Sequence, residues 1–342
     1  METRQPIQAI PGVLRATLDV SRAEYAAVLR KVRWGEGPLY VCAEGSCAGL
    51  GLAAGYAFAS FVGRPVIAHP PTVFQTYALP LLAPRSVLLF LSAGEDRPEA
   101  LELAHTVRQR GGVVAVLTTN AASALAQTAD HVFRATAEAP PDSPAATVAL
   151  HAALSNLAFE SARIAKRPEP HWEALEREFA ELPEKLDWLF VQFAPLLRSL
   201  AAEIVPAPWL RVVAGGFFHF PAVRMALQLR SRAGVPAEAV DAAEFGSSIS
   251  GKVAGQDVLL FLSGAQSKVK KVVHAAAAQC HIKGARVLAL TDSNDRELAA
   301  RADLGVLVPP FLEPAASTLA LFLAEWLAVE VRRAQQGKPV SK

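Results

Sequence analysis

The sequence contains the same six residues twice, and this repeat limits the possible folds more than any other feature. The hexapeptide Val-Leu-Leu-Phe-Leu-Ser occupies residues 87–92 and returns at residues 258–263, an offset of 171 in a chain of 342 residues. A register held along the chain indicates an internal duplication, so we expect two copies of one domain. The same offset superposes further pairs: Leu39 on Leu210, Gly45 on Gly216, Gly63 on Gly234, Pro65 on Pro236 and Phe74 on Phe245.

Each copy alternates short apolar runs with longer helical patterns. The runs in the first copy span residues 39–43, 66–69, 87–91, 113–117 and 131–134, and those in the second copy span residues 210–214, 235–240, 258–262, 287–290 and 305–308. The run at residues 87–91 is apolar throughout, which is typical of a central strand covered by helices on both faces. Strands that alternate with helices form a parallel sheet with right-handed crossovers. The predicted fold class is α/β, with two flavodoxin-like αβα sandwich domains that each contain a parallel five-stranded sheet.

The segments around the repeats suggest the domain limits. The connector between the two copies is helical in pattern throughout, and Pro168 and Pro170 interrupt it. We read it as a link between domains and not as a third domain. The expected segments are an N-terminal helix at residues 1–34, a first domain at 35–143, the connector at 144–206, a second domain at 207–333 and a C-terminal tail at 334–342.

Charge and cysteine content exclude several classes of protein. The net charge is +2 and the densest basic cluster is Lys268 with Lys270 and Lys271, so we expect no nucleic-acid partner. Three cysteines without a paired framework are typical of a reducing cytoplasm. No stretch approaches the roughly 20 uninterrupted apolar residues of a membrane span. We expect a soluble cytoplasmic protein with no metal site and no cofactor.

Loops rich in glycine and serine follow several of the expected strands. In doubly wound α/β folds, ligands bind at the carboxyl ends of the strands. Glycine lets backbone N–H groups approach a ligand, hydroxyl groups donate hydrogen bonds, and helix N-termini favour negative charge, so a phosphate is the natural ligand. The alternative is that these residues are ordinary turn and N-cap residues. The loops span residues 44–47, 92–96, 215–218, 245–248 and 263–267.

The order of these loops resembles the SIS (sugar isomerase) domain family, and the tandem form is similar to the isomerase half of glucosamine-6-phosphate synthase. Gly45-Ser46-Cys47 matches the family's Gly-Thr-Ser turn, and residues 91–96 match its Ser-x-Ser-Gly-Glu-Thr loop. The resemblance implies a sugar derivative as ligand. It also implies substrate contacts from Gly45, Ser46, Ser92, Gly94 and Glu95 in the first copy, and from Ser247 and Ser248 in the second.

Several positions depart from the family pattern. Leu91, Ala93 and Asp96 stand where the family has two serines and a threonine that contact the phosphate. Asp96 would also bring a carboxylate near that phosphate. Gln228 and Ser231 stand where the family has a lysine and its catalytic glutamate. The family's acid–base residues are therefore missing from these positions.

Other residues would have to perform the acid–base chemistry. Aldose–ketose isomerisation needs a base over the C1 and C2 hydrogens and a donor that polarises the carbonyl group. Glu244 begins a segment, residues 244–248, that resembles the family's Glu-Phe-x-His-Gly-Pro with the histidine lost, and His219 follows the Gly215-Gly216 turn. We predict Glu244 and His219 as the catalytic residues. The alternatives are a capping or surface carboxylate and a histidine packed at a helix start.

Two functional hypotheses remain open. The first is an enzyme that acts on a sugar phosphate or aminosugar derivative, as an isomerase or a deaminase or deglycase that passes through an enediol or enamine, without glutaminase activity. The alternative is a non-catalytic protein that binds or senses a carbohydrate derivative. In either case we expect a homodimer, because Trp326, the final helix and the helix at residues 190–200 are more apolar than one small core requires.

Overall fold

The computed structural model describes residues 4–32, 38–43, 45–94, 97–136, 139–141, 143–167 and 171–337. They form two compact units. The first unit contains Ala9–Pro183, and the second unit contains Met1–Gln8 together with Glu184–Lys342. The division falls inside helix α8 (Trp172–Gln192), between Pro183 and Glu184.

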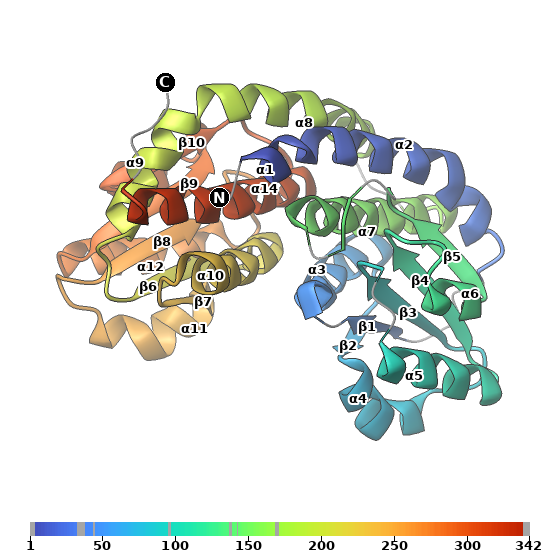
Figure 1. The fold of residues 1–342 in the computed structure, drawn as a ribbon. Coiled ribbons are helices and arrows are strands. Elements are labelled where there is room, and N and C mark those ends of the chain that lie inside the picture. Colours follow the sequence, from blue (N-terminus) through green and yellow to red (C-terminus); the bar gives the residue numbers. More distant parts are fainter. Residues whose placement is uncertain are drawn as a thin grey trace. The chain divides into compact units, whose positions relative to one another are not determined.

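The first unit is built on a five-stranded parallel sheet with strand order β2-β1-β3-β4-β5. Parallel pairing sets Ala43 of β1 opposite Leu91 of β3, so the carboxyl ends of these two strands lie side by side (Figure 1). All strands of the sheet pair in parallel, as expected for a sheet built by helical crossovers. The strands are β1 (Leu39–Ala43), β2 (Val66–His69), β3 (Val87–Ser92), β4 (Val113–Thr118) and β5 (His131–Arg134).

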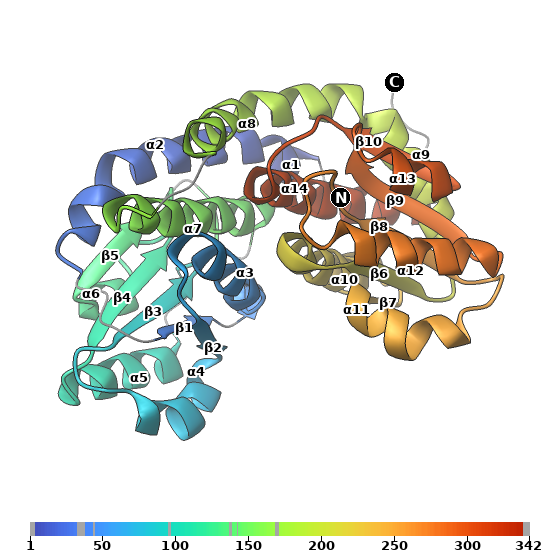
Figure 2. The ribbon, with the colours of Figure 1, turned by 180° about the vertical axis from the view of Figure 1, so that it is seen from behind.

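Helices cover both faces of this sheet. One face carries α4 (Pro71–Val73), α5 (Pro98–Gln109) and α6 (Ala124–Thr128), and the other carries α2 (Ile10–Leu29), α3 (Leu50–Ala57) and α7 (Pro144–Ile164). Figures 1 and 2 show α2 and α7 running side by side. The unit is therefore an αβα sandwich.

The second unit repeats this plan. Its parallel sheet has the order β10-β9-β8-β6-β7, which is the order of the first sheet read from the other end. Both sheets thus have the flavodoxin-like order 2-1-3-4-5, and the predicted fold class is confirmed. The strands are β6 (Leu210–Ala214), β7 (Ala237–Asp241), β8 (Val258–Leu262), β9 (Arg286–Asp292) and β10 (Leu304–Val308).

Helices again form two layers around the second sheet. One face carries α11 (Ala242–Glu244), α12 (Lys270–Ile282) and α13 (Arg296–Arg301). The other face carries α9 (Ala194–Ile204), α10 (His219–Ala233) and α14 (Glu313–Gln335). The short helix α1 (Gln5–Gln8) from the start of the chain also packs against α14.

The duplication extends to the backbone of the first turn in each unit. Gly45 follows β1 with φ of 58°, and Gly216 follows β6 with φ of 57°. This left-handed conformation is strained for residues with a Cβ atom, so glycine is needed at both places. The matched pair explains why the repeat keeps a glycine where each first strand turns into a helix.

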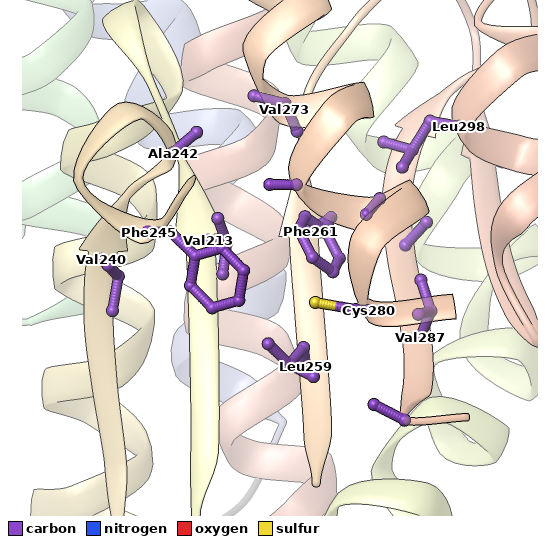
Figure 3. Close-up of a cluster of buried hydrophobic side chains, with 14 of the residues drawn as sticks. Val213, Val240, Ala242, Phe245, Leu259, Phe261, Val273, Cys280, Val287 and Leu298 are labelled. Atoms are coloured by element: carbon purple, nitrogen blue, oxygen red, sulfur yellow. The ribbon is translucent and has the colours of Figure 1, made fainter. Parts of the chain in front are cut away.

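A cluster of buried apolar side chains fills the space between α12 and the second sheet (Figure 3). Phe245 and Phe261 are fully buried at its centre, with ring centroids 6.4 Å apart in an edge-to-face arrangement. Complete burial of one such ring contributes roughly 1.5–3 kcal/mol to folding. Cys280 of α12 points into the same cluster, and burial raises the pKa of its thiol to about 12. The thiol therefore stays protonated and acts as an apolar side chain.

Helix α14 supplies the core on the opposite face. It is the one helix in the described part of the chain that is long and apolar enough to cross a membrane, with a mean hydropathy of 1.4, but 94% of that stretch is buried inside the unit. Trp326 is fully buried and lies 4.8 Å from Phe190 and 5.7 Å from Phe322, measured between ring centroids. The expectation that Trp326 is available to a dimer partner was therefore wrong, because its own unit uses the whole side chain.

The segment at residues 245–248 was expected to be a loop, and it is helical, as is the corresponding segment after β2. The chain continues from α4 through a π-helical turn at Phe74–Ala78 and a 3-10 turn at Leu79–Leu81, and from α11 through the same two kinds of turn at Phe245–Ile249 and Ser250–Lys252. Phe74 and Phe245 are fully buried, so these turns close the ends of the two cores. Pro168 and Pro170 lie outside the described residues.

Candidate functional site

Two loops meet at the carboxyl-terminal edge of the first sheet. The turn Gly45–Cys47 follows β1, and the loop after β3 begins at Ser92. The hydroxyl of Thr119 donates a hydrogen bond of 2.8 Å to the carbonyl oxygen of Ala93, which ties the second loop to the end of β4. A Cβ atom on Gly94, whose φ is 95°, would lie 2.7 Å from the Cβ atom of Asn120. Glycine is therefore required where this loop passes Asn120.

A hollow lies between these loops and the start of α5, and we call it the Ser92 hollow. It contains about 370 Å³ of space, counting the part open to solvent. Most of its wall is apolar, and the polar groups are the hydroxyl of Ser92, two thiols and the guanidinium of Arg97. Its lining residues are Cys42, Ala43, Cys47, Pro71, Phe90, Leu91, Ser92, Ala93, Arg97, Ala100 and Leu125.

The residues predicted from the first copy lie at this edge. Gly45 and Gly94 shape the two loops, and Ser92 lines the hollow with 8% of its surface exposed. The hydroxyl oxygen of Ser92 accepts a hydrogen bond of 3.1 Å from the N–H group of Gly94, so this N–H group is not available to a ligand. Ser46 lies in the first turn. Glu95, like Asp96, falls outside the described residues.

Sequence reasoning missed Arg97 and the two thiols of the hollow. Arg97 is exposed at the N-cap of α5, and Pro98 follows at the first helical position, where it offers no N–H group. The N–H group of Ala100 donates to the carbonyl oxygen of Arg97 at 3.1 Å. This helix start therefore presents few free backbone donors to an anion, and the guanidinium of Arg97 is the positive charge at the hollow. The Arg-Pro pair at the helix start was the available signal.

The residues predicted from the second copy lie at the corresponding edge of the second sheet. Ala214 of β6 pairs with Asp241 of β7, so the loops that carry His219 and Glu244 leave neighbouring strands. His219 is half-buried at the start of α10, and its Nδ1 atom has no hydrogen-bond partner among the described residues. Glu244 is exposed at the end of α11. The structure thus brings the two predicted catalytic residues to one edge.

Ser247 and Ser248 bond back to their own turn. Both are exposed, and their hydroxyl groups donate to the carbonyl oxygen of Glu244, at 3.0 Å and 2.7 Å. Each hydroxyl keeps its acceptor capacity while its proton is engaged. The predicted residues of the first copy belong to the first unit, and Ser247 and Ser248 belong to the second.

Helix α10 uses the family's catalytic positions for a different purpose. Gln228 is 3% exposed, and its amide nitrogen donates to Oε1 of Glu325 at 3.3 Å. Arg224 donates to the same oxygen at 2.5 Å, so the group joins α10 to α14 inside the second unit. Ser231 is exposed and donates to the carbonyl oxygen of Leu227 at 2.8 Å. An amide and a helix-bound hydroxyl cannot act as the family's lysine and glutamate do.

A second hollow, of about 320 Å³ counting its open part, lies beside α14 in the second unit. Ser263 lines it, is 3% exposed, and its hydroxyl oxygen has no partner among the described residues. Glu313 at the start of α14 accepts a hydrogen bond of 3.0 Å from the N–H group of Lys268. Burial raises the pKa of the Glu313 carboxyl, and that hydrogen bond opposes the rise.

In the described part of the chain, no group of three or more His, Cys, Asp or Glu side chains could hold a metal ion.

Comparison with solved structures finds the same arrangement of elements in several proteins. The C-terminal domain of glucosamine-fructose-6-phosphate aminotransferase from Francisella tularensis matches with a TM-score of 0.82 and 14% identity, over 97% of this chain and 95% of that one. Tagatose-6-phosphate ketose/aldose isomerase from Escherichia coli matches with a TM-score of 0.74 and 17% identity, over 98% of this chain and 94% of that one. At these identities the likeness concerns the fold. No curated protein sequence matches the chain.

The family model provides the more direct evidence of kinship. The model of the SIS domain matches residues 35–159 and again residues 205–329. The two matches cover both sheets and most of the helices around them. The chain therefore belongs to the SIS domain family, of which it carries two copies in tandem.

Proposed function

We propose that the chain binds a sugar phosphate or an aminosugar derivative at the carboxyl-terminal edge of its first sheet. The observation that carries this proposal is the Ser92 hollow, where the loops after β1 and β3 meet. Gly45, Ser46, Gly94 and Glu95 are the further contact residues that we assign to this ligand. The names of the two structural relatives, which refer to phosphosugars, support the ligand class.

Arg97 is central to the electrostatics of this proposal. Leu91 and Ala93 remove hydroxyl donors from the wall of the hollow, and Pro98 removes a backbone donor from the helix start. A phosphate then depends on the guanidinium of Arg97, which can bind its oxygens in a bidentate manner. We infer that Arg97 replaces the missing hydroxyl groups as the main anion contact.

Thermal unfolding in the presence of candidate ligands tests this binding. Fructose 6-phosphate, glucosamine 6-phosphate, tagatose 6-phosphate and their unphosphorylated forms make a suitable panel. A ligand at 100 times its Kd stabilises the protein by about 2.7 kcal/mol, a clear shift in melting temperature. Arg97→Gln should abolish the shift, whereas Arg30→Gln, which changes an exposed arginine at the end of α2, should keep it. If none of these ligands shifts the melting temperature, the proposal is refuted.

Catalysis is a second candidate, favoured by the unpartnered Nδ1 atom of His219. In this reading the sugar lies at the carboxyl-terminal edge of the second sheet, beside Ser247 and Ser248, and not in the Ser92 hollow. Glu244 removes the proton from C2 of an aldose to form an enediol and returns it to C1, while His219 polarises the carbonyl group. The related deaminase or deglycase reaction would use the same base and pass through an enamine. The arrangement of Gln228 and Ser231 favours the other alternative, a non-catalytic binding or sensing protein.

Hydrogen exchange at the sugar carbons separates the two readings. The proton that the base removes from carbon exchanges with solvent during the lifetime of the enediol, so NMR in D₂O should show deuterium at C1 or C2 of the phosphosugar. Glu244→Gln should then lower the exchange rate at least 100-fold and leave the ligand-induced melting shift intact. Binding without any exchange by the unmodified protein would assign the chain to the non-catalytic class.

We also propose that the protein is cytoplasmic. The three cysteines are buried and none of them is in a disulfide, as expected where no oxidising chemistry pairs them. The test is to express the same chain with a periplasmic export signal and to analyse its cysteines by mass spectrometry. If the assignment is right, the exported protein should be poorly folded or carry modified thiols.

A further inference from the structure

A second hollow of the first unit is larger than the Ser92 hollow and does not lie at a strand edge. It lies between α2, α7 and α8, and contains about 930 Å³ of space counting its open part, against about 370 Å³ for the Ser92 hollow. We call it the interhelical cavity. It shares no residue with the Ser92 hollow. Its lining residues are Arg22 of α2, Asn156, Phe159, Glu160 and Arg163 of α7, and Glu173, Glu176, Arg177 and Phe179 of α8.

The floor of the interhelical cavity is buried. Phe159 and Phe179 are each 3% exposed and provide an apolar surface. Asn156 is 7% exposed, and its amide nitrogen donates to the hydroxyl oxygen of Ser21 at 2.5 Å. This hydrogen bond fixes the amide, and its carbonyl oxygen accepts no hydrogen bond within the described residues. The floor therefore offers one fixed acceptor beside two aromatic rings.

Half of the charges around the cavity are already paired. Nη1 of Arg163 lies 3.2 Å from Oε1 of Glu160 and 2.7 Å from Oε1 of Glu176. Arg163 thus bridges α7 and α8 at one side of the cavity. These three side chains link the walls and together carry one net negative charge, so the three arginines and three glutamates of the lining balance.

The other charges have no partner of opposite sign. Glu173 and Arg177 lie four residues apart on α8 and form no ion pair with each other or with any other described residue. The guanidinium of Arg22 makes one hydrogen bond, of 3.4 Å, to the backbone carbonyl oxygen of Glu176. Two cations and one anion therefore face a cavity with an apolar floor.

This combination selects a small zwitterion. The guanidinium groups of Arg22 and Arg177 can bind a carboxylate, and the carboxylate of Glu173 can bind an ammonium group. The rings of Phe159 and Phe179 suit an apolar body, and the carbonyl oxygen of Asn156 can accept a further hydrogen bond from the ammonium group. We propose that the interhelical cavity binds a free amino acid with an apolar side chain, independently of the sugar ligand.

Calorimetric titration of the full chain tests this proposal. The probes are L-phenylalanine, L-leucine and L-methionine. Phenylacetate, which lacks the ammonium group, and 2-phenylethylamine, which lacks the carboxylate, are the matched controls. We expect saturable binding of at least one amino acid, and at least tenfold weaker binding of both controls.

Variants assign the binding to this cavity. Arg177→Gln and Glu173→Gln change exposed side chains, so the fold should be retained, and each should raise the Kd at least tenfold. Arg30→Gln, which changes an exposed arginine of α2 outside the cavity, should leave the Kd unchanged. The proposal is overturned if none of the three amino acids binds, if phenylacetate binds as tightly, or if the two α8 variants bind normally.

Discussion

Ser92 and Ser263 hold the same place in the two repeats but have different surroundings. The hydroxyl oxygen of Ser92 accepts the N–H group of Gly94, whereas that of Ser263 has no partner in the described part of the chain. A buried hydroxyl without a partner costs roughly 1–3 kcal/mol, and a satisfied hydrogen bond contributes about 1 kcal/mol. Replacing serine with alanine is therefore expected to change the free energy of unfolding in opposite directions at these two positions.

We expect Ser92→Ala to lower the free energy of unfolding by about 1 kcal/mol and Ser263→Ala to raise it by a similar amount. Urea unfolding of both variants beside the unmodified chain measures the two changes. Equal shifts of the same sign would show that the two hydroxyl groups are equally satisfied in solution, and the contrast between the repeats would be lost.

His151 makes the stability of the first unit depend on pH. It lies in α7 and is 1% exposed, and burial lowers its pKa from 6.5 to about 4. The unfolded chain binds this proton more tightly than the folded one. The free energy of unfolding therefore falls as the pH falls from about 6.5 to about 4, by roughly 2–3 kcal/mol in total.

His151→Gln removes the titrating group and should flatten this part of the pH profile. The measurement is the free energy of unfolding of both proteins at several pH values between 7 and 4. His105→Gln, which changes an exposed histidine of α5, is the control and should leave the profile unchanged. A profile of His151→Gln parallel to that of the unmodified chain would show that the buried histidine does not drive the effect.

At the scale of elements, the pair α10 and α14 depends on one buried charge network. Arg224 and Glu325 are 4% and 1% exposed, and Oε2 of Glu325 has no hydrogen-bond partner among the described residues. Burial makes removal of either charge expensive, because the remaining charge has lost its compensation. The network thus holds the two helices in register.

Arg224→Met should lower the free energy of unfolding by about 3–5 kcal/mol, because it leaves Glu325 buried without a counter-charge. The double variant Arg224→Met with Glu325→Leu should recover most of that loss. Arg301→Gln breaks the exposed pair with Glu297 and should cost at most about 1 kcal/mol. Denaturant unfolding measures the free energy of unfolding of the three variants. If the single Arg224→Met variant is as stable as Arg301→Gln, the network does not have this role.

Strands were predictable from the sequence and the short helical turns were not. The runs at Leu39–Ala43, Val66–His69 and Leu210–Ala214 coincide with β1, β2 and β6. Strand β1 is buried along its whole length, which requires apolar residues throughout, whereas β2 is half-buried and ends in a histidine. Pro70-Pro71 after β2 indicates a break, yet Pro71 sits at the first turn of α4, where proline is tolerated. The buried Phe74 then makes the turn part of the core.

The candidate sites show the same division. Glycine and serine after the strands predicted the edge that contains Ser92, because parallel strands place their carboxyl ends together. The interhelical cavity could not be predicted in this way. Arg22, Arg163 and Arg177 come from three helices, of which α2 is far in the sequence from the consecutive α7 and α8, and on each helix they resemble ordinary solvated charges. Only the packing of the helices brings them together.

At the scale of the whole molecule, the second unit is built from both ends of the chain. Ile7 of α1 is fully buried, and Nε of Arg4 lies 2.8 Å from Oε1 of Glu330 on α14. The indole nitrogen of Trp326 donates to the same glutamate at 3.0 Å. The charge of Glu330 inside the apolar helix α14 is thereby satisfied by the start of the chain, so the duplicated halves are not independent segments of sequence.

The homodimer that we propose needs an apolar surface other than the buried Trp326. Trp188 and Val191 are 48% and 69% exposed, and their spacing of three residues places them on one face of α8. Leu196 in the following helix is 39% exposed. Exposed apolar side chains that share a helix face can mark an interaction surface. We propose this face of α8, with Leu196 as a further contact, as the dimer contact.

Light scattering should give about twice the chain mass of 36.4 kDa for the unmodified protein. Val191→Glu puts a charge into the contact, and a buried charge without a partner is costly, so this variant should return the mass to that of one chain. Ile282→Glu, which changes a side chain of α12 that is 83% exposed, should leave the dimer intact. If the unmodified protein has the mass of a single chain, the proposal of a dimer is refuted. A dimer that survives Val191→Glu would move the contact away from α8.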